Sequence, residues 1–164
     1  MNNSNNTKRA SLLADRILQG ANMLMEYSEG LTDSEWKTPV VGDGRSIGVV
    51  VHHVASVYPM EIELAQLLAS GQDIQGANID VVNKMNAEHA FENSNVKKHE
   101  TLELLKHNSK IAADSVRKFT DNQLDTSAKV SLNADAPLTA QFFIEDHALR
   151  HSFHHLLKIK ESLK

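Results

Sequence analysis

Apolar side chains recur along most of this chain with the period of an α-helix, and this repeat constrains the fold more than any other feature. In the first stretch they recur every three or four residues, as on one face of a helix. That stripe comprises Leu12, Leu13, Ile17, Leu18, Ala21, Leu24 and Met25. With only seven glycines and three prolines in 164 residues, little interrupts such stretches. The chain is therefore predicted to be mostly helical, with a first helix that ends near Gly30.

Turn and capping residues divide the remainder into further helices. Three long ones and one short one are expected, at residues 46–70, 95–119, 137–164 and 79–92 respectively. Pro59 should kink or break the first of these. Thr32 and Thr120 each begin a capping-box pattern that predicts a short helical turn, and the segment from there to Pro137 is expected to be loop. Four long helices predict an all-α four-helix bundle with short accessory helices and no sheet of consequence.

The length of the chain predicts one domain with a sizeable core. Residues 1–7 are expected to be a disordered, asparagine-rich tail, and residues 8–164 the single domain. The net charge is −4 without a lysine- or arginine-rich stripe, which argues against nucleic acid as a partner. No stretch is apolar enough for a signal peptide or a membrane span, so a soluble, cytoplasmic protein is expected. Because the chain has no cysteine, a metal site would need histidines and carboxylates.

Histidines are concentrated near the C-terminus, where residues 147–155 contain four of them. His151 and His155 are one helical turn apart, so they share a face, and His147 and His154 flank it. In the second long helix, His53 lies among apolar residues that should form the core stripe. Those residues are Val49, Val50, Val57, Met60, Leu64 and Leu68. A buried imidazole needs a partner, because an unsatisfied buried polar group costs about 1–3 kcal/mol.

Two interpretations of these histidines follow from spacing alone. His53, His151 and His155 would offer three imidazole nitrogens on rigid helices, and three protein ligands with an open fourth position are typical of catalytic zinc. Alternatively, His53 is a core histidine bonded to a carboxylate or carbonyl, and the His151–His155 pair is a chance spacing or a pH-sensitive surface. His147 with His151 is a competing pair one turn earlier. Spacing does not decide between these interpretations.

Two segments resemble a known family. Residues 46–55, SIGVVVHHVA, are similar to the second-helix motif of the DinB/YfiT-like superfamily. Residues 151–155, HSFHH, followed by Ile159, are similar to the family's last-helix His-x-x-His-His pattern. The resemblance covers about residues 8–162, although only the two histidine segments are specific.

The resemblance implies a DinB/YfiT-like four-helix bundle that holds a divalent metal through His53, His151 and His155. Zinc would be the first choice, with nickel, iron or manganese as alternatives. Relatives include metal-dependent S-transferases and isomerases that use low-molecular-weight thiols, and others are described as hydrolases. The expected function is therefore a metal-dependent enzyme, either a thiol S-transferase or a hydrolase, that acts on a small molecule. The alternative is a metal-binding, stress-associated bundle without catalysis.

The sequence departs from the family pattern at two places. Arg45-Ser46 stands where the family often has an aromatic residue, and Leu157-Lys158 stands where glycine-glutamine is usual. Neither change removes a proposed metal ligand, but because of both, the identity of the substrate does not follow from the resemblance. The catalytic residues are likewise undetermined. Candidates for supporting a ligand or transferring a proton are Glu61, Asn86, His89, Glu145 and His147.

Two apolar stripes opposite the histidines suggest a homodimer. On the last helix the stripe comprises Phe142, Leu149, Phe153 and Leu156, and on the second it comprises Val51, Ala55, Tyr58 and Ile62. Each stripe must be buried either in the bundle core or against a second subunit. Large exposed apolar patches favour association, so a homodimer is predicted.

Overall fold

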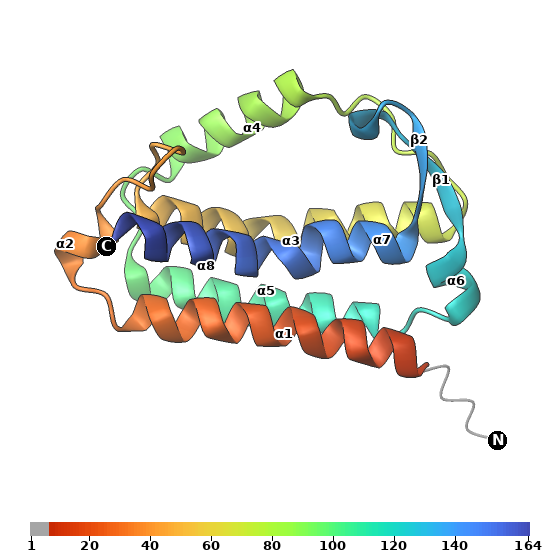
Figure 1. Ribbon diagram of the computed structural model, residues 1–164, viewed down its shortest axis with the longest axis horizontal. Coiled ribbons are helices and arrows are strands. Elements are labelled where there is room, and N and C mark those ends of the chain that lie inside the picture. Colours follow the sequence, from red (N-terminus) through yellow and green to blue (C-terminus); the bar gives the residue numbers. More distant parts are fainter. Residues whose placement is uncertain (1–6) are drawn as a thin grey trace.

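Four long helices form the body of the protein, in a computed structural model that describes residues 7–164. They run lengthwise in Figure 1. They are α1 (Lys8–Glu29), α3 (Ile47–Ala69), α5 (Lys98–Val116) and a last helix built from α7 (Ala140–Ile144), η2 (Glu145–Leu149) and α8 (Arg150–Ser162). The predicted all-α four-helix bundle is confirmed.

Shorter elements connect the long helices. They are α2 (Asp33–Trp36), α4 (Ile79–Glu92), α6 (Asp121–Asp125), β1 (Ser127–Val130), the 3₁₀ turn η1 (Ser131–Asn133) and β2 (Ala136–Thr139). Both predicted capping boxes are present. Thr32 exchanges hydrogen bonds with Glu35 at the start of α2, and Thr120 does so with Gln123 at the start of α6.

The segment expected to be loop before Pro137 is instead a small hairpin. Strands β1 and β2 pair antiparallel, with Ser127 opposite Thr139 and Val130 opposite Ala136. Ala134 and Asp135 make the turn with positive φ angles of 56° and 59°. The sequence signal was weak because hairpin turns of this kind usually contain glycine or asparagine at such positions. The backbone amide of Ile74 also bonds to Lys129, so the hairpin is tied to the segment that follows α3.

The helices form a ring in which α1 packs mainly against α5 and α8, and α3 packs mainly against α5 and the last helix. The sequence colours in Figure 1 show that α3 and α5 run in the same direction. The connection between them must therefore return along the whole bundle, and α4 forms most of it. In Figure 1, α4 stands apart from the four long helices, above α3 and the last helix. None of its residues is buried.

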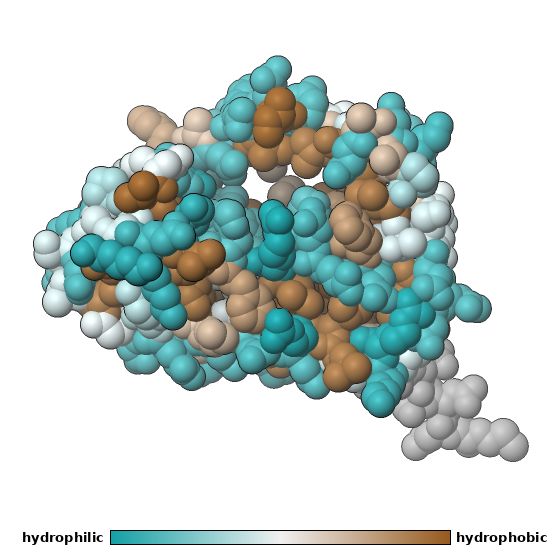
Figure 2. Space-filling view, in the orientation of Figure 1, coloured by the Kyte–Doolittle hydropathy of each residue, from teal (hydrophilic) through white to brown (hydrophobic). Residues whose placement is uncertain are grey.

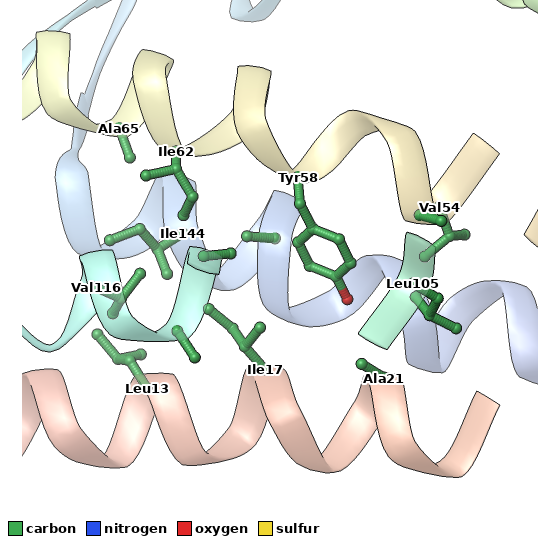
Figure 3. Packing of buried hydrophobic residues seen from close by; sticks show 14 of the residues in the cluster. Leu13, Ile17, Ala21, Val54, Tyr58, Ile62, Ala65, Leu105, Val116 and Ile144 are labelled. Carbon is green, nitrogen blue, oxygen red and sulfur yellow. The ribbon is translucent and has the colours of Figure 1, made fainter. Parts of the chain in front are cut away.

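The core lies between the four long helices, where Leu13, Ile17, Tyr58, Leu105 and Ile144 point toward one another (Figure 3). Tyr58 is fully buried, and its hydroxyl lies 2.7 Å from that of Ser152.

Close packing also joins α1 to α8. A β-carbon at Gly20 would lie 2.8 Å from the ring of Phe153, so only glycine lets these two helices approach as they do. The guanidinium group of Arg16 also lies over the Phe153 ring, 4.9 Å from its centroid.

The face of α3 assigned to the core is only partly in it, because Val50 and Leu68 are buried in the core whereas Val57, Met60 and Leu64 line the cavity. Val51, Ala55, Tyr58 and Ile62, which were a candidate dimer surface, are buried in the bundle core. The His53 face instead looks toward α4, and its Met60 is 39% exposed. The periodicity gives two apolar stripes but not which of them meets the other helices, so it could not separate core from cavity wall.

The other stripe behind the dimer prediction also packs inside the bundle. Leu156 is buried in the core, Phe153 packs on Gly20, and only Phe142 is largely exposed, at 47%. The surfaces that motivated a dimer are thus mostly occupied within one chain. Dimer formation itself stays a prediction.

Pro59 does not break α3, which continues unbroken from Ile47 to Ala69. A proline has no backbone N–H, so the carbonyl of Ala55, four residues earlier, loses its usual helical partner. The side chain of Asn108 in α5 donates a hydrogen bond to that carbonyl, at 2.8 Å. The missing bond is therefore replaced by a contact between two helices.

The N-terminal tail prediction falls mostly on residues 1–6, which lie outside the described residues. Thr7 is described, and its hydroxyl accepts a hydrogen bond from the Ala10 amide as the N-cap of α1. Among the helices of the described part of the chain, none is long and apolar enough to cross a membrane.

Candidate metal centre

The first turns of α3 are fixed in place, and this positions His53. Ser46 caps the helix by accepting a hydrogen bond from the Val49 amide. Gly48 lies against the indole of Trp36, where a β-carbon would come within 2.5 Å of the ring. Trp36 in turn donates its indole N–H to the Val96 carbonyl at 3.2 Å. His53 follows two turns into the helix on the face toward α4.

Three histidines from two helices meet at this point. His53, His151 and His155 each offer one ring nitrogen, and these nitrogens all lie within 4.8 Å of one another. The Nε2 atoms of His53 and His151 are 3.2 Å apart. Two nitrogens bound to one tetrahedral zinc at 2.0–2.1 Å would be about 3.3 Å apart, so this separation fits a shared ion. The structure thus brings together the three residues proposed from the sequence.

Glu61, which also lies on α3, contacts one of the three histidines. Its Oε1 lies 2.7 Å from Nδ1 of His151, and the side chain is almost wholly buried. A carboxylate only accepts hydrogen bonds, so it holds the hydrogen of His151 on Nδ1 and leaves Nε2 with a free lone pair. That lone pair faces His53. The second carboxylate oxygen, Oε2, is buried and has no hydrogen-bond partner among the described residues.

Burial keeps two of the histidines neutral. Burial, with a smaller contribution from the neighbouring His151, lowers the pKa of His53 to about 2 and that of His155 to about 3. Neutral imidazole is the form that binds a metal. The donor set therefore fits a divalent ion at neutral pH without any rearrangement of charge.

A cavity of about 500 Å³ opens beside the three histidines. Its floor is α3 and the last helix, and its roof is α4; Figure 2 shows the opening beneath α4. Besides the histidines, its lining is mostly apolar. The apolar lining residues are Val57, Met60, Leu64, Ile74, Ala77, Val81, Val82, Met85, Val130, Leu132 and Phe143.

His89 on the roof helix reaches back to α3. Its Nε2 lies 2.9 Å from Nδ1 of His52 and 3.3 Å from the hydroxyl of Ser56. Its ring also lies edge-on to His53, with centroids 5.6 Å apart. Burial lowers the pKa of both His52 and His89. Of the candidates named from the sequence, Glu61 and His89 are therefore the two that contact the cluster.

Arg45 lines the same end of the cavity, just before the start of α3. Its Nε and Nη2 donate to the carboxylate of Asp43 at 2.6 and 2.7 Å, which lowers the pKa of Asp43. Its Nη1 is buried and has no hydrogen-bond partner in the part of the chain that the structure describes. A guanidinium nitrogen beside a metal centre favours an anionic group in the cavity.

The remaining sequence candidates are placed differently. His147 and Asn86 line the cavity, and the His147 ring stacks on Phe143 with centroids 4.2 Å apart. His147 is not part of the three-histidine cluster, so the competing pair with His151 does not form. Glu145 accepts a hydrogen bond from Gln141 instead.

The sequence patterns did not identify Arg45, His52 or Ser56 as parts of the site. Arg45 alone carried a usable signal, because it departs from the family pattern next to the His53 motif. The π-helical segment η2 was also missed. Such segments add a residue to a turn and often occur at functional sites, but no local sequence signal marks one.

Comparisons with known proteins support the fold and leave the family open. No protein-family model matches the chain, and no curated protein matches it in sequence. A solved structure does match, that of YfiT from Bacillus subtilis, described as a probable metal-dependent hydrolase with an unusual four-helix bundle topology. The match has a TM-score of 0.75 and 18% identity, and it covers 95% of this chain and 87% of YfiT. At that identity the likeness shows the fold, and the chain has the DinB/YfiT-like four-helix bundle.

Proposed function

We propose that this protein is a metal-dependent hydrolase that acts on a small molecule. One observation carries the proposal: three histidine nitrogens within 4.8 Å of one another lie at the end of a cavity large enough for a substrate. The same fold in a probable metal-dependent hydrolase supports it. We propose His53, His151 and His155 as the ligands and zinc as the ion, since three imidazoles suit zinc.

A bound divalent ion supplies a Lewis acid and lowers the pKa of a water molecule beside it. The residues of the chain have separate roles. Glu61 holds His151 in the required orientation and tautomer. A substrate that fills the cavity would displace water from its apolar walls, which would strengthen electrostatic interactions at the histidines. His89 lies beside His53 and its Nδ1 has no hydrogen-bond partner among the described residues, so it is our candidate to exchange a proton with a bound substrate.

Metal analysis of untagged protein tests the site. We expect close to one equivalent of a transition metal, and the loss of most of it in H53A, H151A and H155A. His154 is the matched control, because it lies on the same helix but is exposed. H154A should keep its metal. Unchanged metal content in all three ligand variants, with their helical content intact, would contradict the proposed ligands.

Hydrolysis of activated esters and amides, before and after metal removal, tests the reaction. We expect turnover that chelation abolishes and that zinc restores. A metal that binds with full occupancy but supports no turnover on any such substrate would favour the non-catalytic alternative.

A thiol S-transferase is the second candidate, and Arg45 is the observation that favours it. Arg45 lines the cavity and its Nη1 has no hydrogen-bond partner among the described residues, so it would pair with a carboxylate of a low-molecular-weight thiol such as glutathione or bacillithiol. Consumption of an electrophile only when such a thiol is added, with a KM for the thiol that R45Q raises, would replace hydrolysis by this reaction.

A further inference from the structure

The cavity is elongated along α3, away from the histidines. His53, Val57, Glu61 and Leu64 all line it and recur at intervals of three or four residues, so they form one stripe on the helix. His53 and Leu64 are eleven residues apart, which corresponds to about 16 Å of helix. The cavity is therefore a channel with the proposed metal at one end.

The two ends of the channel differ in chemistry. Arg45, His53, His89 and His155 lie at the near end, whereas Glu61, which bonds to His151, lines the channel about two turns farther along α3. The far end is lined by Leu64, Ile74, Val130 and Leu132, which are all apolar. A ligand that fits both ends must have one polar end and one apolar end.

The roof of the channel is apolar without being part of the core. Val81, Val82 and Met85 of α4 all line the channel, although none of them is buried and Met85 is 44% exposed. These side chains would lose contact with water on binding an apolar ligand. The four long helices do not bury α4, so only a ligand in the channel would give these side chains the favourable free energy of apolar burial.

We propose that the channel binds the straight apolar chain of an acyl substrate, with the carbonyl end at the three histidines. This rests on the proposed function, because it names the substrate class of the same site. Each methylene that enters the channel should tighten binding about fourfold, until the chain reaches the far end.

Calorimetric titration with straight-chain carboxylates from acetate to decanoate tests this without relying on turnover. The titrations are made on both metal-depleted and zinc-loaded protein. We expect affinity to rise steadily with chain length in both forms. Affinity that does not change with chain length in either form would overturn the channel.

Two variants locate the binding. M85E places a charge in the roof and should weaken decanoate binding tenfold or more while leaving acetate binding unchanged. M23E is its matched control, because Met23 is also a partly exposed methionine, at 40%, but it lies on α1 away from the channel. Equal decanoate affinity in the two variants would overturn the assignment.

The outcomes separate the two proposals. Chain-length dependence in a protein that binds none of zinc, nickel, iron or manganese would support the channel and refute the metal-dependent hydrolase. Stoichiometric zinc binding with no chain-length dependence would do the reverse.

Discussion

One hydrogen bond at the site, between Glu61 and His151, shows how a residue can affect metal binding without being a ligand. Glu61 lies against Nδ1 of His151, which leaves the opposite nitrogen free to bind a metal. Such partners raise the basicity of the ligand and fix the orientation of its ring. The same contact holds α3 and α8 together at the point where the three histidines meet.

Replacing the charge of Glu61 should therefore weaken metal binding without removing a ligand. We expect E61Q to lower zinc affinity about 10- to 100-fold, as is usual for a carboxylate that supports a histidine ligand. Competition with a chromophoric chelator measures it. E63Q is the control, because Glu63 is an exposed carboxylate two residues away. Equal zinc affinity in the two variants would show that Glu61 has only a packing role.

At the scale of elements, α3 depends on α5 for one of its own backbone bonds. Pro59 leaves the Ala55 carbonyl without a helical donor, and Asn108 supplies one. An unsatisfied buried carbonyl costs about 1–3 kcal/mol. The continuity of α3, and with it the spacing of His53 and Glu61, therefore relies on a side chain from another helix.

A double-mutant cycle tests this dependence. N108A should lower the free energy of unfolding by about 1–3 kcal/mol, because the Ala55 carbonyl then has no partner. In a P59A background the restored N–H should bond to Ala55, so the same change should cost clearly less. Urea unfolding measures both. A cost of N108A that is equal in the two backgrounds would contradict this role.

The elements show what could be predicted from the sequence and what could not. Four helices and both capping boxes follow from periodicity and local hydrogen bonding, which act over a few residues. Which stripe of α3 enters the core does not, since Val51 and Val57 are equally apolar and only packing with distant helices distinguishes them. The hairpin turn was missed because Ala134, one of its two residues at positive φ, is not a usual turn former there, and no glycine accompanies Asp135.

The three histidines could be proposed because two short motifs resemble a known family, whereas local spacing relates only His151 and His155. The surroundings of the site could not. The contact of His89 with His52 joins residues 37 positions apart and depends on where α4 lies. The position of α4 is set by the course of the whole chain, which periodicity does not describe.

For the whole molecule, buried neutral histidines make stability depend on pH. The pKa of His53 is lowered to about 2 and that of His155 to about 3, whereas both take ordinary values near 6.5 once unfolded. Below pH 6.5 the unfolded chain therefore binds more protons than the folded one. The contribution to stability is complete above about pH 6.5 and is lost as the pH falls toward 3.

We expect the metal-free protein to lose up to about 2 kcal/mol per buried histidine between pH 6.5 and pH 5. Urea unfolding at a series of pH values measures this slope. H155Q should flatten it, because its side chain does not titrate. H99Q should leave it unchanged, because His99 is exposed. A slope in H155Q as steep as that of the unaltered protein would contradict the assignment.

The course of the chain has a further consequence for α4. Because α3 and α5 run in parallel (Figure 1), the chain must cross the length of the bundle between them, and residues of that crossing segment line the cavity. The cover is thus the connection that the topology requires, and no separate lid is needed. Its residues contribute little to the core, so they are free to change without loss of the fold. Substitutions in this one segment would let the same scaffold acquire new substrates while the histidine cluster stays the same.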